Sequence, residues 1–184
     1  ATTYRVTGGY LIKETGTKLR ASYATGFRAP SINELFFPNF GNPNLKPEKS
    51  QSFDIGIDQT FWDRRVTLSA GYFWNRYRQL IVATFDPAGC APLTPFGFCA
   101  QNIGSAKSQG WEGSAKLVLA EGLPYMKVLD LQGQYTYTIT RDLETGARLP
   151  RWPVHQGSLV LTYQPITPLS VTTTLRYVGS RFNT

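Results

Sequence analysis

The sequence has no long hydrophobic run. None of its apolar stretches approaches the about 20 residues that a membrane-spanning helix needs, so no such helix is predicted. It also has no positively charged segment followed by an apolar one, the pattern of an export signal. The 184 residues begin without Met, and both ends fall within or just after alternating runs. These ends predict a fragment of a longer protein.

Histidine and cysteine are scarce. His155 is the only histidine, and Ser158 nearby does not belong to a recognisable nucleophile motif. Glycine-rich nucleotide motifs of the Walker and dinucleotide-binding types are absent. Cys90 and Cys99 have no second pair and no nearby His to complete a zinc site. We therefore expect no enzyme, no metal site and no cofactor.

The two cysteines lie close together in the stretch CAPLTPFGFC. A disulfide between Cys90 and Cys99, closing a short loop, is the interpretation that we favour, and it implies an oxidising compartment. Two free thiols are the alternative.

Charge is modest, at 17% Asp, Glu, Lys and Arg, with a formal net charge of +7. The Lys and Arg residues are scattered along the chain and do not form one stripe, which argues against nucleic acid as the partner. Contact with anionic lipid headgroups or lipopolysaccharide, or a solvated surface, explains the positive charge at least as well.

What the sequence does contain is an alternation of period two, which predicts β-strands. In LDLQGQYTYTIT, residues 129–140, apolar and aromatic side chains fall on one face and Asp, Gln and Thr on the other. Low mean hydropathy, −0.24, is compatible with this pattern because the two faces cancel in the average. Eight such segments are found, at residues 4–12, 19–27, 53–61, 66–74, 111–119, 129–140, 157–163 and 170–178.

The connections between the expected strands are sorted by length. Short turns follow the first, third, fifth and seventh strands, and long loops follow the second, fourth and sixth, at residues 28–50, 86–107 and 141–155. A soluble sandwich also alternates, but it has no reason to place its long loops at one end. Short turns at one end and long loops at the other are typical of transmembrane β-barrels.

Aromatic residues support the same interpretation. If the short turns share one end, most aromatic side chains of the apolar face fall near the opposite end, and a smaller group falls near the turns. Tyr and Trp favour positions between an apolar and a wet environment, so two girdles are expected at the two membrane interfaces. The upper group is Tyr23, Phe27, Tyr72, Trp74, Trp111, Tyr135, Tyr137 and Tyr177, and the lower is Tyr10, Phe61 and Tyr163.

Eight strands could close into a small barrel, whose interior side chains would have to fill it. The expected inward side chains are mostly small, such as Thr136, Thr138, Thr172 and Thr174, and would leave a wide, wet lumen. The fourth strand also continues to about residue 85, beyond the about 10 residues that cross an outer membrane. We therefore predict an open arc of a larger antiparallel barrel, with the first and last strands unpaired to each other.

Four motifs resemble one family. The sequence GFRAP at Gly26–Pro30 leads into GNPNLKPE at Gly41–Glu48; NIGSAKSQGWE and LPRWPVH follow at residues 102–112 and 149–155. In this order they are similar to the barrel of TonB-dependent outer-membrane receptors, with most likeness to the cobalamin-receptor-like branch. The resemblance implies one domain over residues 1–184, with strands thirteen to twenty of a barrel of about 22 strands. A plug domain, a TonB box and the final strands are not in this sequence.

The resemblance implies a function. Such receptors take up a scarce ligand, such as a siderophore-bound metal or cobalamin, across the outer membrane of a Gram-negative bacterium, with energy supplied through the TonB complex. In this family the long loops form a ligand vestibule, and this role would explain the aromatic side chains in them. The candidate ligand-binding residues are Asn33, Phe36, Phe37, Phe40, Phe96, Phe98, Arg151 and Trp152.

Other interpretations of these features stay open. Phe36, Phe37 and Phe40 could only pack their loop against the barrel rim, as could Phe96 and Phe98. Arg151 and Trp152 could anchor a loop at the interface. The alternative to energised import is a passive or structural outer-membrane barrel, a porin or a membrane anchor.

Overall fold

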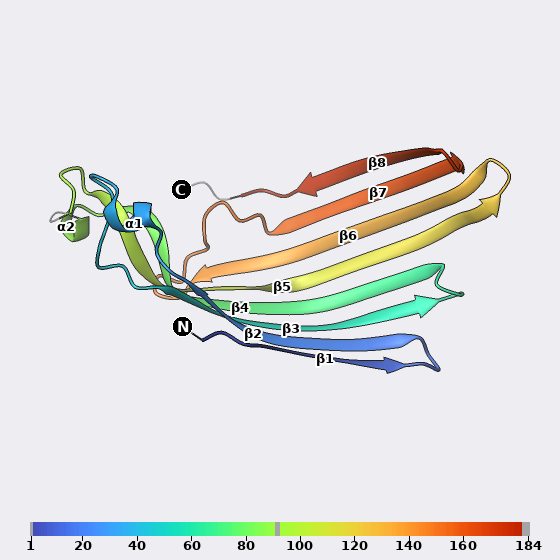
Figure 1. Ribbon diagram of the computed structural model, residues 1–184, viewed down its shortest axis with the longest axis horizontal. Helices are drawn as coiled ribbons and strands as arrows, with labels where there is room; N and C mark the ends of the chain where they lie inside the picture. Colours follow the sequence, from blue (N-terminus) through green and yellow to red (C-terminus); the bar gives the residue numbers. More distant parts are fainter. Residues whose placement is uncertain (1, 91–92, 182–184) are drawn as a thin grey trace.

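The computed structural model describes residues 2–90 and 93–181 and places eight β-strands in one sheet (Figure 1). The prediction of eight strands is confirmed. Two short helices, α1 (Ile32–Phe36) and α2 (Pro87–Cys90), lie in the connections. The strands are β1 (Arg5–Ile12), β2 (Thr17–Arg28), β3 (Glu48–Phe61), β4 (Val66–Phe85), β5 (Phe98–Leu123), β6 (Met126–Asp142), β7 (His155–Ile166) and β8 (Leu169–Val178).

Every strand pairs antiparallel with its neighbours in the sequence, in the order β1 to β8. Within the described residues, β1 and β8 are the two edges and do not pair with each other, so the predicted open arc is confirmed. No helix of the described part is long and apolar enough to cross a membrane.

The two faces of the sheet differ as the alternation predicted. One face, called the aromatic face below, carries Phe53 paired with Trp74 on β3 and β4, and Trp111 paired with Tyr137 on β5 and β6. Tyr72, the register partner of Trp111, packs against it with tilted rings whose centroids are 4.9 Å apart. Tyr135, Tyr137, Leu175 and Tyr177 share this face by register, and none is in a buried core.

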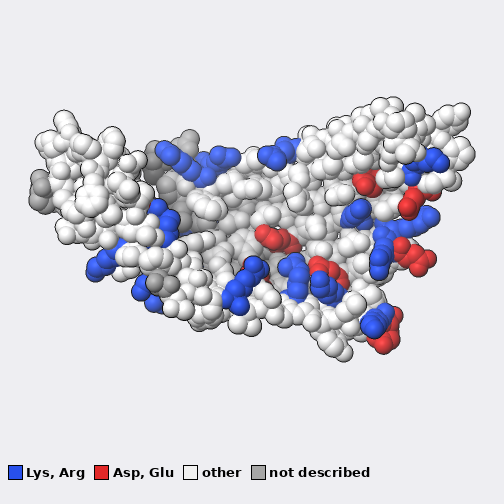
Figure 2. All heavy atoms as spheres, viewed as in Figure 1, with Lys and Arg blue, Asp and Glu red and all other residues white. Residues whose placement is uncertain are grey.

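The opposite face, called the polar face, holds the buried polar side chains of the strands, Ser108, Asp130 and Thr140. Figure 2 shows Asp and Glu next to Lys and Arg over the middle of the sheet. Between β6, β7 and β8 this face has a hollow of about 450 Å³, lined by Gln134, Thr136, Gln156 and Ser158 among others. Polar side chains therefore line this face, as the alternation predicted.

The connections are sorted by end, with short turns at one end and long segments at the other (Figure 1). These are called the turn end and the loop end below. The loops expected at 28–50, 86–107 and 141–155 are shorter in the structure: β2 ends at Arg28 and β3 begins at Glu48, β5 begins at Phe98, and β6 ends at Asp142.

The structure differs most from the prediction in the second loop, which was expected at residues 86–107. Residues 98–107 belong to β5, which pairs with β4 as far as Phe85↔Phe98. The stretch FCAQNIGSAK has mostly small or polar side chains, so no alternation marked it as a strand. Residues 91 and 92 of the same loop lie outside the described residues. The fourth strand was correctly predicted to be tall, since β4 has 20 residues.

Candidate functional site

The hydrophobic core of the described chain lies at the loop end. Leu45, Ile81 and Ala100 are buried together, and Leu35 and Phe40 pack against them. These residues come from the α1 loop (residues 29–47), from β4 and from β5. The tall β4–β5 ladder is thus the platform on which the α1 loop folds. We call the α1 loop and the α2 loop (residues 86–97) together the loop layer.

The sequence SINE starts helix α1. The hydroxyl of Ser31 accepts a hydrogen bond from the Glu34 backbone N–H at 3.2 Å, and the Glu34 carboxylate accepts one from the Ser31 N–H at 2.7 Å. This capping box satisfies two N–H groups that the first turn leaves free. At the other end, a Cβ on Gly41 would lie 2.7 Å from backbone atoms of Leu35 and Phe37, so only glycine permits this return of the chain.

Two asparagines fasten the α1 loop to the tall strands. The Asn42 amide donates to the Ala100 carbonyl at 3.1 Å. The Asn102 amide donates to the carbonyls of Lys46 and Gln79 at 2.8 and 2.7 Å, and its carbonyl accepts from the Lys46 N–H at 2.7 Å. Each side chain replaces backbone partners that an irregular loop cannot supply to itself.

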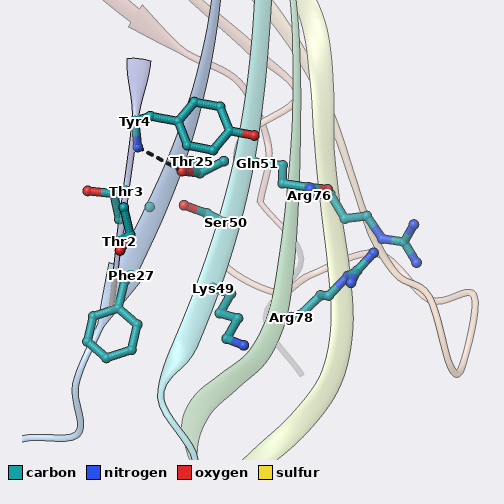
Figure 3. Close-up of a pocket in the computed structure, with 11 residues that line it drawn as sticks. Thr2, Thr3, Tyr4, Thr25, Phe27, Lys49, Ser50, Gln51, Arg76 and Arg78 are labelled. Carbon is teal, nitrogen blue, oxygen red and sulfur yellow. Dashed lines mark hydrogen bonds between the residues drawn. The ribbon is translucent and has the colours of Figure 1, made fainter.

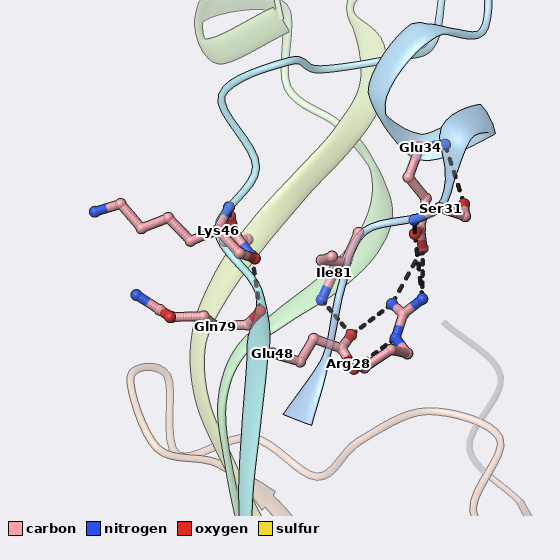
Figure 4. A network of polar contacts seen from close by, with 8 residues as sticks. Arg28, Ser31, Glu34, Lys46, Glu48, Gln79 and Ile81 are labelled. Atoms are coloured by element: carbon pink, nitrogen blue, oxygen red, sulfur yellow. Dashed lines mark hydrogen bonds and ion pairs between the residues drawn. The ribbon is translucent and has the colours of Figure 1, made fainter. Parts of the chain in front are cut away.

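A charged network closes the base of the α1 loop (Figure 4). The guanidinium of Arg28, the last residue of β2, donates to both Glu48 oxygens at 2.8 and 2.7 Å and to both Glu34 oxygens at 3.1 Å. A Glu48 oxygen also accepts from the Ile81 N–H at 2.8 Å. One cation therefore joins β2, α1, β3 and β4.

The network shifts the acidity of its members. Hydrogen bonds to Glu48 and then to Glu34 raise the pKa of Arg28. The hydrogen bond from Arg28 lowers the pKa of Glu48, and the Ile81 N–H adds to the effect against partial burial. Burial alone would raise the pKa of Glu34, but the hydrogen bonds from the Ser31 backbone and Arg28 outweigh it, so that pKa is lowered. Both carboxylates are thus ionised wherever the network is intact.

The α2 loop is closed by a disulfide between Cys90 and Cys99, whose Cα atoms are 5.8 Å apart. Both residues are fully buried. The bond joins α2 to the second residue of β5, and next to it the rings of Phe98 and Phe40 lie 5.8 Å apart. The α1 loop therefore touches the first residue of β5, next to the disulfide that closes the α2 loop.

The structure separates the loop aromatics into two groups. Phe40 is half-buried and packs against the core, and Phe98 contacts it. Phe36, Phe37 and Phe96 are exposed by 67%, 55% and 70%. Asn33 is also exposed, and its backbone carbonyl accepts a hydrogen bond from the Phe37 N–H. Packing therefore explains Phe40, whereas the rings of Phe36, Phe37 and Phe96 stay largely exposed.

The third loop stands apart. Arg151 and Trp152 are exposed, and Arg151 has a positive φ of 65°. No hydrogen bond, ion pair or ring contact joins either residue to the loop layer within the described part of the chain. The third loop does touch β5, because the Leu143 N–H donates to the Ser105 carbonyl at 2.7 Å.

The structure offers no catalytic arrangement around His155. Its Nδ1 lies 2.6 Å from the hydroxyl of Tyr135, and its ring lies against Tyr137, all on the aromatic face. Ser158 is on the polar face, because it stands an odd number of residues away on the same strand. Among the described residues, no group of three or more His, Cys, Asp or Glu side chains could hold a metal ion.

The residues that build the loop layer were not among the predicted site residues. Arg28, Glu34, Glu48, Asn42 and Asn102 carry most of its polar contacts. Four of these, all except Glu34, lie in motifs that the sequence analysis singled out, so the motifs were the available signal. A motif does not show which of its residues contact one another in the fold.

Known proteins resemble this chain in sequence and in structure. The "Vitamin B12 transporter BtuB" of Vibrio vulnificus is 41% identical over 93 residues, which is 50% of this chain and 14% of that protein. Among solved structures, the ferric enterobactin receptor PfeA of Pseudomonas aeruginosa aligns with a TM-score of 0.75 at 22% identity, and the ferripyoverdine receptor of the same organism with 0.65 at 27%.

These structural matches cover 97% and 94% of this chain but only 28% and 22% of the two receptors, so the chain spans about a quarter of their length. The family of these proteins consists of transporters and receptors of the outer membrane, not of enzymes. A sequence model of the family "TonB dependent receptor-like, beta-barrel" matches residues 1–184. The chain therefore belongs to the TonB-dependent receptor β-barrel family.

Proposed function

We propose that this chain is part of the wall and of the ligand vestibule of an outer-membrane transporter, which imports a scarce ligand with energy delivered through TonB. The ligand class is a metal chelate or cobalamin. Supporting this are the family and the relatives, whose names include a vitamin B12 transporter and receptors for ferric siderophores. An outer membrane has no ATP, so accumulation of a scarce ligand needs energy from elsewhere.

The observation that carries the proposal is the rigid loop layer with exposed rings. Phe36, Phe37 and Phe96 project from loops that are held by a capping box, a disulfide and an ion-pair network. A backbone that is held in advance loses little conformational entropy when a ligand covers its side chains, which favours binding. A passive barrel has no need to hold aromatic side chains in this way.

The test uses the full-length receptor that contains this segment, expressed in a Gram-negative strain without its own receptors. Uptake of labelled cobalamin and of ferric siderophores is measured with and without TonB. We expect saturable uptake of one of them that disappears without TonB. Equal, unsaturable permeation of unrelated small solutes in both strains would contradict import and favour a passive barrel.

Substitution of the exposed rings tests the vestibule. Replacing Phe36 and Phe37 with Ser should weaken ligand binding by at least about tenfold, since each aromatic ring that the ligand covers contributes about 1 to 2 kcal/mol. The matched control is Trp62→Ser, which removes a ring that is also largely exposed but lies at the turn end. An unchanged affinity of the Phe36, Phe37 variant would remove this surface from the proposed vestibule.

A further inference from the structure

Five cations gather on the aromatic face at its loop end. On each strand they stand an even number of residues from the aromatic side chain of that strand, so they share its face. The register brings them together: Lys49 pairs with Arg78, Arg76 with Lys107, and Lys107 with Arg141. They therefore form a patch across β3 to β6, called the basic patch below.

The basic patch has no acidic counterpart. The aromatic-face positions of β3 to β6, at residues 49–61, 66–78, 105–117 and 129–141, carry no Asp or Glu. The three ion pairs of the described chain involve Arg20 and Arg28, both on the polar face. Within the described residues, the five cations thus lack a carboxylate partner.

Next to the patch is a hollow of about 320 Å³ (Figure 3). Lys49, Arg76 and Arg78 line it together with Thr25 and Gln51. Figure 3 shows both guanidinium groups extending on the same side of β4. The Nε of Arg76 is buried and has no hydrogen-bond partner among the described residues. A buried donor left unpaired is costly, which favours an oxygen-rich ligand at this place.

The height of the patch above the aromatic row determines which layer of the membrane it meets. Arg76 stands two residues above Trp74 and Arg78 four, which is about 7 and about 13 Å along a strand. If the aromatic row marks the edge of the hydrocarbon core, Arg76 lies in the headgroup layer, which is about 5 to 8 Å thick on each side, and Arg78 lies just above that layer. Tilting of the strand brings both positions closer to the hydrocarbon core.

We propose that the basic patch binds the phosphate groups of a phosphorylated glycolipid of the lipopolysaccharide class, anchored in the leaflet beside the barrel. This rests on the proposed function only in placing the aromatic face against a membrane. Arg presents a planar fork that matches phosphate oxygens, and Arg76 and Arg78 with the three other cations of the patch suit a ligand with more than one phosphate. The hollow takes the sugar that carries the phosphate.

The test uses the full-length receptor in detergent with three probes: purified lipopolysaccharide, the same lipid after enzymatic dephosphorylation, and inorganic phosphate. The variant Arg76→Gln/Arg78→Gln removes two charges from the patch. Its control is Lys18→Gln/Lys116→Gln, which removes two exposed charges from the polar face. Binding is measured by native mass spectrometry of the intact receptor.

We expect lipopolysaccharide to bind the wild type and the control alike, and the patch variant at least about tenfold more weakly. Dephosphorylated lipid should bind all three proteins as weakly as the patch variant binds lipopolysaccharide. Equal affinity of the patch variant and the wild type for lipopolysaccharide would overturn the proposal. So would inorganic phosphate binding as tightly as the lipid, because it would make the patch a site for free anions.

Ligand uptake separates this proposal from the proposed function. The patch variant should transport its ligand like the wild type, since the patch is on the opposite face from the lumen. If the full-length wild type binds lipopolysaccharide but shows no TonB-dependent uptake, import is refuted and the lipid site stands.

Discussion

Replacing Gly110 with valine should prevent β5 from pairing with β6. A Cβ at this position would overlap the Tyr137 carbonyl oxygen and lie 2.8 Å from the ring of Phe73. The clash is with the backbone of the neighbouring strand, so no side-chain movement relieves it. We expect destabilisation of about 3 kcal/mol or more, at the upper end for single substitutions. The measurement is urea-induced unfolding of the full-length receptor in detergent.

The same strand provides the control for this change. Gly113 lies on the aromatic face, and a Cβ there would meet only the Ser69 carbonyl oxygen at an ordinary 3.9 Å. Gly113→Val should therefore unfold at a urea concentration close to that of the wild type. Equal stability of the two variants would contradict the close approach of Gly110 to the Tyr137 backbone.

Replacing Arg28 with methionine should loosen the loop layer at neutral pH. The change leaves Glu34 and Glu48 facing each other without their shared cation, and both are only partly exposed. Removing one partner of such a network costs about 1 to 3 kcal/mol, less than in a fully buried site because Arg28 is 47% exposed. Hydrogen exchange at the Ile81 and Ser31 amides, both donors to these carboxylates, measures it.

The protection of the Ile81 amide against hydrogen exchange should also depend on pH. Because the pKa of Glu48 is lowered by Arg28, its carboxylate stabilises the fold at pH values above its unfolded pKa, about 4.3. This stabilisation is lost as the pH falls through the lower, folded pKa. Protection of Ile81 in the wild type should thus be constant from pH 7 to about 5 and fall below about 4. In Arg28→Met it should be low throughout.

Arg20→Met is the matched control, because Arg20 also pairs with a carboxylate on the polar face. Its Nε is 3.4 Å from Asp58, a longer contact that anchors no loop. We expect less than about 1 kcal/mol from this change. A loop layer in Arg28→Met that is protected like the wild type would mean that the network does not hold it.

Much of the architecture was predictable because it rests on alternation, which a sequence displays directly. A strand such as residues 129–140 places Leu131 and Tyr135 on one face by its period alone, and loop lengths then give the ends. The start of β5 could not be predicted in this way. Its first residues are mostly small or polar, and the core that buries Ala100 is completed by Leu45 of the α1 loop, so contacts between distant residues, backbone pairing and the disulfide determine the strand there.

The loop layer was less predictable because it depends on contacts between distant residues. Phe36, Phe37 and Phe40 are alike in the sequence, yet only Phe40 reaches the core beneath α1. The same holds for charge. The Lys and Arg residues are scattered along the sequence, but the register of four strands brings five of them into one patch, so absence of a stripe in the sequence did not mean absence of a patch in the fold.

We expect the aromatic face to contact lipid and the polar face to contact water in the lumen. Spin labels placed singly at residues 131 to 136 of β6 in the full-length receptor, reconstituted in bilayers, measure this. Collisions with oxygen, which dissolves in lipid, and with a water-soluble nickel complex are compared. Labels at Leu131, Gly133 and Tyr135 should favour oxygen, and labels at Gln132, Gln134 and Thr136 the nickel complex. Equal exposure of both sets to the nickel complex would contradict the account.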